Sequence, residues 1–238
     1  TDLTFSTYND RWKERDPNWK PAAYQKEQDP IRGVFAYVAD GLLQPGEEAP
    51  AHQPQLLPGQ VKLKNINGDD KLNEEDMVLI GRNDPKFIFG FNNNFSYKNF
   101  DLNIYMYGQV GKIAGANSYY DAWGSYGNRI KLGQNVPVSF KDAWSSDNQT
   151  STRPSFIESA YGTGDLFLQK ISFLRIRNIT LGYTVPISKS ICNRLRVYAD
   201  VNNPCVWTNW KGQDPETDSN TNAYPNVTSF SIGVDISF

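Results

Sequence analysis

The stretch Val227-Thr-Ser-Phe-Ser-Ile-Gly-Val-Asp-Ile-Ser-Phe238 alternates apolar and polar residues and ends on an aromatic side chain. Successive side chains of a β-strand point to opposite sides, so the apolar residues of this stretch share one face. The residues on that face are Phe230, Ile232, Val234, Ile236 and Phe238. A strand with one apolar face that ends on an aromatic is typical of the last strand of an outer-membrane β-barrel, which meets lipid.

Six further segments have strand character, and turns or loops separate them. Together with the closing stretch, the predicted strands span residues 2–9, 31–39, 87–97, 99–109, 171–185, 194–203 and 227–238. Two of them form a hairpin through the tight Lys98-Asn99 connection, and each has about the 9–11 residues that cross a bilayer when tilted. In segment 171–185, Arg175 and Arg177 have the same parity as Ile179, and a β-bulge near Arg177 would restore the alternation.

The connections between these strands alternate between short and long. The long ones are Gly41–Lys86, Val110–Lys170 and Asn203–Asn226, all rich in glycine and polar residues. Bacterial barrels have short periplasmic turns and long extracellular loops, so with Phe238 at the periplasmic end the long connections fall outside the cell. Strands of a soluble β-sandwich alternate in the same way, and periodicity alone leaves barrel and sandwich open.

Composition excludes several other classes of protein. The 238 residues have a mean hydropathy of −0.58 and contain no run near the ~18 apolar residues that a spanning helix needs. Net charge is −2 without a Lys/Arg run, so no nucleic-acid footprint is present. Thr1 opens the chain without a signal peptide, and Leu3–Thr7 already reads as a strand; we expect a chain that starts within the barrel.

Whole phrases of the sequence carry a family resemblance. The phrases are Tyr37–Gln44, Pro58–Asp69, Pro85–Leu102, Phe173–Tyr183, Leu195–Asn203 and Gly212–Glu216, followed by the closing strand. In this order and spacing, from Tyr37 to Phe238, the chain resembles the C-terminal part of the SusC/RagA family of TonB-linked outer-membrane transporters.

The resemblance implies an all-β fold: the antiparallel C-terminal strands of a transmembrane β-barrel of the 22-stranded class, with long extracellular loops. It implies a multi-pass protein of the bacterial outer membrane that imports oligosaccharides or peptides without an enzymatic step. A surface lipoprotein of the SusD type would be its partner, and TonB would supply energy. The plug domain and the TonB box belong to the family's N-terminal part, so we expect neither in this chain. Phe238 would be the barrel-assembly terminus.

One loop has the spacing of a calcium site. Residues 65–76 fit the twelve-residue calcium-loop frame, in which side-chain oxygens alternate and position 7 offers its backbone carbonyl. The candidate ligands are Asn65, Asn67, Asp69, Lys71 (backbone carbonyl), Asn73 and Asp76. The family usually has Asp at the first position and Gly at the sixth, where this chain has Asn65 and Asp70, and this weakens the match. We expect Ca²⁺ ahead of Mg²⁺, and the alternative is an Asx-rich turn without metal.

Aromatic residues gather in the long Val110–Lys170 connection. Tyr119, Tyr120, Trp123 and Tyr126 lie there among glycines. Aromatic rings stack on sugar faces or peptide side chains, which makes this loop a candidate for substrate contact; packing of the loop or contact with a lipoprotein is the alternative. Trp207 and Trp210 are predicted to be interfacial anchors.

Other site chemistry has little support. The only histidine, His52, lies in a segment whose composition is typical of a loop, and no nucleophile motif is nearby. Asp214 and Glu216 flank Pro215 and are interpreted as turn formers. A strand of about 40 Å would separate Cys192 from Cys205, which predicts two free thiols.

The sequence has two alternative interpretations besides the SusC-like transporter. One is a soluble extracellular β-sandwich binding module with a calcium loop. The other is a TonB-dependent receptor for small chelates, which lacks the SusC-like phrases. Seven strands cannot close a large barrel, so the chain alone would leave two strand edges unpaired, and we expect it not to fold by itself in water.

Overall fold

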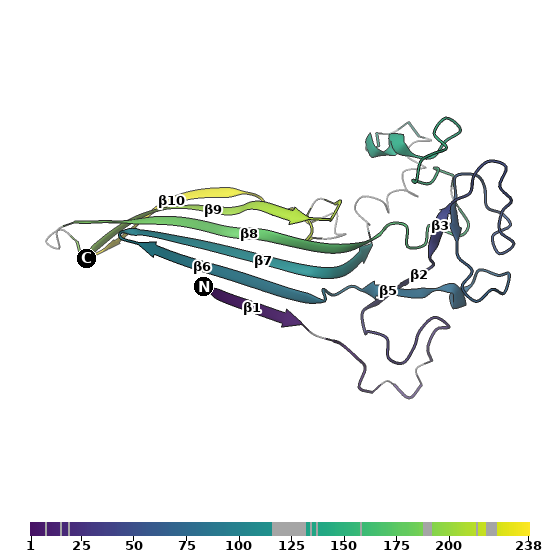
Figure 1. Cartoon of the computed structure of the whole chain (residues 1–238), viewed down its shortest axis with the longest axis horizontal. Helices are drawn as coiled ribbons and strands as arrows, with labels where there is room; N and C mark the ends of the chain where they lie inside the picture. The colour runs from purple at the N-terminus through teal and green to yellow at the C-terminus, as the bar shows by residue number, and fades with distance from the viewer. Residues whose placement is uncertain are drawn as a thin grey trace.

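Six strands form one long antiparallel sheet in the order β1-β6-β7-β8-β9-β10 (Figure 1). Their bounds are Asp2–Thr7 (β1), Phe87–Tyr97 (β6), Phe100–Gly115 (β7), Leu168–Val185 (β8), Arg194–Thr208 (β9) and Ser229–Ser237 (β10). The computed structural model describes residues 1–7, 9–14, 16–18, 20–115, 132–133, 135–136, 138–157, 159–187, 192–212, 214–217 and 223–238. The all-β antiparallel fold class is confirmed.

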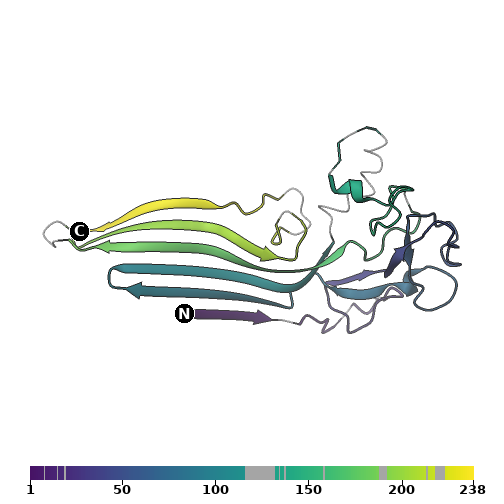
Figure 2. The same cartoon turned by 45° about the horizontal axis from the view of Figure 1, so that its top comes forward.

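The predicted strand 31–39 is wrong as a member of this sheet. Gly33–Ala36 (β2) instead pairs with Val78–Arg82 (β5), and Ala39–Leu42 (β3) pairs with Val61–Leu63 (β4) in a second small sheet. The reason is that β6 already has β1 on one side and β7 on the other, so neither of its edges is free. Figures 1 and 2 show the two small sheets beyond one end of the long sheet.

The long sheet has one apolar and one polar face. The register pairs Phe230 with Val201, Ile232 with Ala199, and Val234 with Val197, so apolar residues of neighbouring strands meet on the same side. We call this side the apolar face and the side of Asp235 the polar face. Ile232 is 84% exposed and Phe230 is 80% exposed. No second sheet covers the apolar face among the described residues, and a β-sandwich would require one.

A bulge near Arg177 is confirmed. Ile176 and Asn178 pair with the adjacent residues Met106 and Tyr105 of β7, which leaves Arg177 as an extra residue. Toward β9, Ile176 pairs with Cys205 and Asn178 with Asn202, so two residues of β9 lie opposite Arg177. The bulge lets Arg175 join the polar face although it shares parity with Ile179 of the apolar face.

The long connections form a loop-rich body at one end of the sheet. Its core contains Leu42, Val61 and Leu63, against which Trp144, Tyr161 and Leu166 of the β7–β8 connection pack. The fully buried Gln53 accepts from Leu63 N (2.7 Å) and donates to Val61 O (3.4 Å). The two long connections therefore fold together, and their backbone is held by buried hydrogen bonds.

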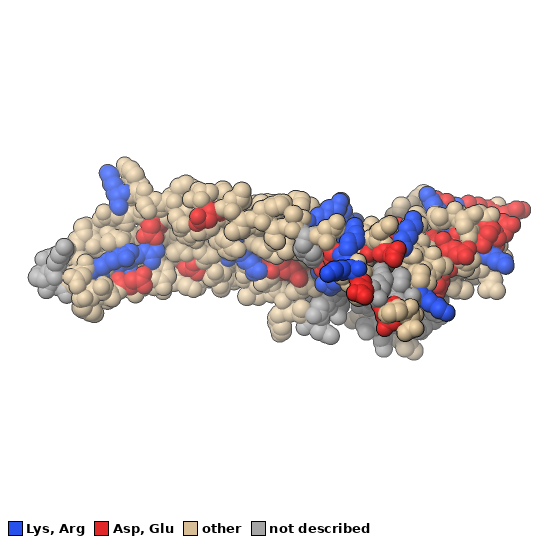
Figure 3. Space-filling view, turned by 90° about the horizontal axis from the view of Figure 1, so that it is seen from below, with Lys and Arg blue, Asp and Glu red and all other residues tan. Residues whose placement is uncertain are grey.

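Helical structure is limited to 3₁₀ turns among the described residues, at Glu74–Asp76 (η1) and Val138–Asp142 (η2). No helix in the described part of the chain is long and apolar enough to cross a membrane. Charged side chains gather toward the loop-rich body, whereas the surface over the strands in the same view is mostly uncharged (Figure 3).

Candidate functional site

Side-chain hydrogen bonds connect the strands across the polar face. Asn103 donates to Asn92 (2.8 Å) and Asn94 (2.7 Å), which ties β7 to β6. Thr180 donates to Asp200 (2.8 Å), which ties β8 to β9. Cross-strand polar pairs stabilise a sheet when one face is polar. The polar face is thus a connected layer of amides, hydroxyls and carboxylates, able to face water or a hydrophilic solute.

Arg196 crosses two strands on this face. Its guanidinium bonds to Asp101 of β7 (2.6 and 3.0 Å) and to Asp235 of β10 (3.0 Å), on either side of its own position in β9. The path toward Asp101 passes over Gly182 of β8, where a Cβ would lie 2.4 Å from Arg196 Nη2. Gly182 is therefore required for close approach rather than for backbone freedom. Asp235 lies opposite the apolar face of Ile232 and Val234, as the alternation of the closing stretch requires.

A buried ion-pair cluster fastens the β9–β10 connection to the sheet. Arg175, whose side chain is 3% exposed, binds both oxygens of Asp214 (2.8 and 2.9 Å) and one oxygen of Glu216 (2.7 Å). Arg177 binds the second oxygen of Glu216 at 2.6 Å. Asn226 also donates to Asp214 through its backbone N (3.0 Å). The interpretation of Asp214 and Glu216 as turn formers alone was therefore wrong; they neutralise two arginines.

The charge state of Asp214 follows from these contacts. Burial would raise the pKa of its carboxyl, but hydrogen bonds from Glu216 N and Asn226 N, together with the charge of Arg175, bring it below the usual 3.8. A carboxyl with a lowered pKa stabilises the folded state above its ordinary pKa. This contribution is lost as the pH falls through the lowered value. At neutral pH, Asp214 is fully ionised and the cluster is complete.

In the calcium-like loop, the candidate ligand oxygens accept hydrogen bonds from nearby backbone amides. Asn65 Oδ1 accepts from Gly68 N (2.6 Å), Asn67 Oδ1 from Asp69 N (3.1 Å) and Asp69 Oδ1 from Lys71 N (3.0 Å). These are Asx turns, which curl a short loop. Asp70 has φ +58°, the left-handed geometry that Gly provides more easily at this position.

The end of the loop is closed by its last candidate ligand. Asp76 is fully buried, and its two oxygens accept from Ile66 N (2.7 Å) and Asn73 N (3.0 Å). Asn73 in turn caps η1 by accepting from Glu75 N (2.7 Å). No group of three or more His, Cys, Asp or Glu with metal-binding geometry occurs in the described part of the chain. The loop geometry alone therefore fits both the metal and the turn interpretations.

The other predicted site residues divide into three groups. Tyr119, Tyr120, Trp123 and Tyr126 lie outside the described residues. Trp207 is 56% exposed, whereas Trp210 is buried against Ala114, Ile171 and Phe173, so it is not an interfacial anchor. Cys192 and Cys205 are both free thiols. Phe238 is 87% exposed at the end of the sheet that carries the short turns (Figure 1).

Sequence comparison finds TonB-dependent receptors. The chain is 27% identical over 236 residues to "TonB-dependent receptor P3" of Formosa agariphila, covering 90% of this chain and 23% of that protein. It is also 27% identical over 180 residues to "TonB-dependent receptor SusC" of Bacteroides thetaiotaomicron, covering 72% of this chain and 17% of SusC. No family model matches.

A structural comparison agrees with the fold. The solved structure of the RagAB peptide transporter superposes with a TM-score of 0.69 over 89% of this chain and 23% of that chain, at 22% identity. The chain is similar in sequence to TonB-dependent receptors, SusC among them, and in fold to part of the RagAB peptide transporter. The chain spans about a quarter or less of the length of the two curated relatives cited above, both of which are named receptors rather than enzymes.

The ion pairs of Arg175 and Arg177 were not predicted, although the sequence contains a signal for them. Arg175 and Arg177 lie out of phase in an otherwise apolar strand, and a buried arginine requires an anionic partner. The only acidic residues in the Gly212–Glu216 phrase are Asp214 and Glu216. Matching the out-of-phase arginines with these two carboxylates would have placed the segment Gly212–Glu216 against the polar face of β8.

Proposed function

We propose that this chain forms part of the barrel wall of an importer in the bacterial outer membrane, and that TonB drives uptake of a complex nutrient. The observation that carries the proposal is the segregation of the long sheet. Ile232, Val234 and their cross-strand neighbours form an exposed apolar band, while the opposite face is a polar, hydrogen-bonded layer. A sheet of this kind suits lipid on one side and an aqueous lumen on the other.

The strand dimensions support the same proposal. β7, β8 and β9 contain 16, 18 and 15 residues, more than the roughly 9–11 that cross a bilayer, so these strands would extend beyond it. The extensions lead into the loop-rich body. This end would face outward, and the short-turn end with Phe238 would face the periplasm (Figure 2). The edges of β1 and β10 have no partner among the described residues, which fits continuation of the barrel by other strands.

The proposal extends to partners by analogy with the relatives. A surface lipoprotein of the SusD type would bind at the loop end, and the cargo would be an oligosaccharide or a peptide. The solved structure with the TM-score of 0.69 is named a peptide transporter, and SusC is a TonB-dependent receptor.

Uptake and partner binding test this proposal in the source bacterium. Deleting the gene should abolish growth on one class of oligosaccharide or peptide, and deleting tonB should have the same effect. The protein should fractionate with outer membranes and co-purify with a lipoprotein in detergent. Recovery in the soluble fraction without detergent would instead favour the binding-module alternative.

We further propose that the loop 65–76 binds Ca²⁺. The Asx turns of Asn65, Asn67 and Asp69 already curl the backbone as a calcium loop requires, and Asp76 lies at its twelfth position. With position 1 an amide, the site has fewer charges than the usual loop, and we expect weak binding that selects Ca²⁺ over Mg²⁺.

A single substitution separates metal binding from turn formation. Asp69→Asn keeps the acceptor for Lys71 N and removes one carboxylate charge. If the loop binds Ca²⁺, saturating calcium should stabilise the wild-type protein by about 2.7 kcal/mol at 100 times the dissociation constant. The variant should respond much less at the same concentration. Thermal unfolding in detergent with Ca²⁺, Mg²⁺ or chelator measures this, and identical curves for all conditions would leave only the Asx turn.

A further inference from the structure

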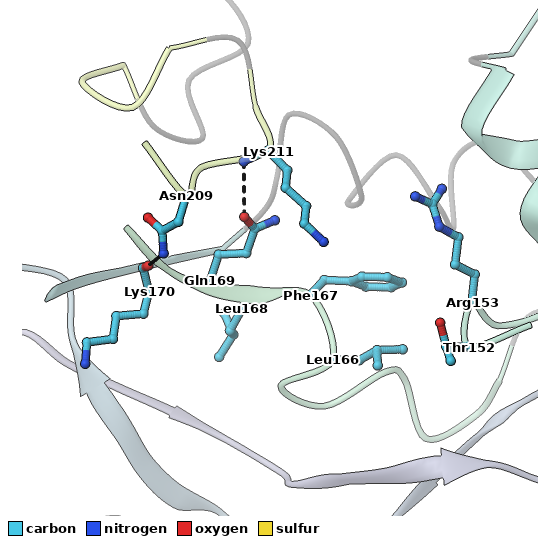
Figure 4. Close-up of a pocket in the computed structure, with 9 residues that line it drawn as sticks. All are labelled: Thr152, Arg153, Leu166, Phe167, Leu168, Gln169, Lys170, Asn209 and Lys211. Atoms are coloured by element: carbon cyan, nitrogen blue, oxygen red, sulfur yellow. Dashed lines mark hydrogen bonds between the residues drawn. The ribbon is translucent and has the colours of Figure 1, made fainter. Parts of the chain in front are cut away.

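Three segments that are far apart in the sequence enclose a cavity where the long sheet meets the loop-rich body (Figure 4). Its volume is about 580 Å³, within the range of ligand pockets. The lining comes from the β7–β8 connection, the start of β8 and the residues after β9. The described lining residues are Thr152, Arg153, Leu166, Phe167, Leu168, Gln169, Lys170, Asn209 and Lys211. Three of these are cationic and none is acidic.

The backbone on each side of the cavity is fixed by hydrogen bonds. Lys211 N donates to Gln169 Oε1 (3.3 Å), and Asn209 Nδ2 donates to Lys170 O (2.6 Å), so the residues after β9 are bound to β8. On the other side, Arg153 N donates to Ser151 Oγ (3.0 Å), and Arg153 O accepts from Trp144 N (2.9 Å). The cationic side chains are therefore carried by positioned backbone rather than by free loop tips.

The side chains around the cavity have a definite arrangement. Phe167, which also packs on Phe140 and Ala143, lies between Lys211 and Arg153, while Lys170 extends away (Figure 4). The Gln169 amide is held through its oxygen, which leaves its NH₂ group as a donor. The cavity thus combines an aromatic wall with several donors, the pattern that suits an anionic group on a larger molecule.

The location of the cavity connects it to the polar face. Arg175, Phe173, Ile171 and Gln169 lie at alternate positions of β8. A second register shift, at Gly111, adds its extra residue to β7 and leaves the alternation of β8 unchanged. Gln169 therefore shares the polar face with Arg175. Arg175 and Arg177 are neutralised by Asp214 and Glu216. No ion pair joins the Lys211 ammonium to a carboxylate among the described residues, which leaves this charge for a ligand.

We propose that this cavity binds an anionic group of the imported molecule, a carboxylate of an acidic oligosaccharide or of an acidic peptide, through Lys211 and the neighbouring NH₂ group of Gln169. The inference rests on the proposed import function and narrows its substrate class. The cavity lies where the loop-rich body meets the polar face, so an anion bound there would be captured before it passes along that face.

Binding to the detergent-solubilised protein tests this inference without any transport step. The probes are fluorescently labelled trigalacturonate and acetyl-tetra-aspartate amide, each with a neutral counterpart, maltotriose and acetyl-tetra-asparagine amide. We expect at least one acidic probe to bind more tightly than its neutral counterpart. Its dissociation constant should rise about tenfold in Lys211→Gln, as for the loss of one charge-assisted hydrogen bond.

Lys141→Gln is the matched control, because Lys141 is exposed on η2 and does not line the cavity. It should leave the dissociation constant unchanged. If only trigalacturonate binds tightly, the carboxylate belongs to a glycan. If only the aspartate peptide binds tightly, it belongs to a peptide. If both bind tightly, the cavity recognises the anionic group itself. Equal binding of acidic and neutral probes, or an equal loss in Lys141→Gln, would overturn the inference. The binding assay contains no TonB and measures no transport, so its failure would not contradict the import proposal, which the uptake experiment tests separately.

Discussion

Replacing Arg175 with methionine is expected to lower the free energy of unfolding by about 3 kcal/mol, the lower end of the cost of breaking a buried ion pair. The substitution leaves Asp214, whose side chain is 4% exposed, without its cation. Backbone amides of Glu216 and Asn226 still bond to that carboxylate, and Glu216 keeps Arg177, so the loss should not reach the upper end of about 5 kcal/mol. Denaturant unfolding in detergent measures the change.

Arg177→Met provides the comparison for this prediction. The Arg177 side chain is 33% exposed, and its partner Glu216 remains bound to Arg175. Its removal should therefore cost about 1 kcal/mol or less. Hydrogen exchange should show faster exchange in residues 214–217 for Arg175→Met than for Arg177→Met. Equal destabilisation by both substitutions would show that the burial of Arg175 does not determine how much the cluster stabilises the fold.

The second large effect concerns the apolar face. Ile232→Lys is expected to destabilise the protein in a bilayer by up to about 2–4 kcal/mol, the cost of a cation on the lipid side at mid-membrane. Ile232 is 84% exposed with no protein atoms to cover it, so a soluble protein would accept lysine there at almost no cost. The amount of folded protein in outer membranes and its unfolding in lipid vesicles both report this cost.

Ser231→Lys is the control on the same strand. Ser231 pairs with Asp200 of β9 and lies on the polar face, where a lysine meets a carboxylate. This variant should fold as the wild-type protein does. If the two lysine variants have the same stability, the apolar face does not contact lipid, and the barrel-wall proposal loses its main support.

The parts of the fold that the sequence predicts best are those with the clearest alternation. The closing strand follows period two throughout, and Phe87–Tyr97 follows it with a single polar residue, Asn93, on the apolar side. The same alternation exposed the bulge at Arg177, since a charged residue out of phase requires a local change of register.

Prediction failed where tertiary context replaces alternation. β7 continues to Gly115 and β8 begins at Leu168, well into the predicted loop. In this region Ile171 and Phe173 lie on the polar face but are covered by Trp210, so both faces contain apolar residues and the period disappears. Residues 33–36 were assigned to the wrong sheet, because a strand of four residues does not specify its partner.

The candidate sites were predictable to different degrees. The loop 65–76 was found from spacing alone, since its ligands are contiguous in the chain. The Arg175–Asp214 cluster joins residues 39 apart, and the cavity around Lys211 joins three segments. Such sites depend on how the loops fold back on the sheet, which local pattern does not encode.

The two neighbouring strands accommodate the extra residue Arg177 in different ways. On the β7 side it is unmatched, and on the β9 side two residues, Asn203 and Pro204, stand opposite it. Deleting Arg177 alone would keep residues 168–176 in register with β7 and Arg175 on the polar face, but Asn203 and Pro204 of β9 would then have no residue of β8 opposite them. Homologues that gain or lose a residue here should therefore carry a compensating length change in β9, and insertions in this barrel wall should be inherited in pairs.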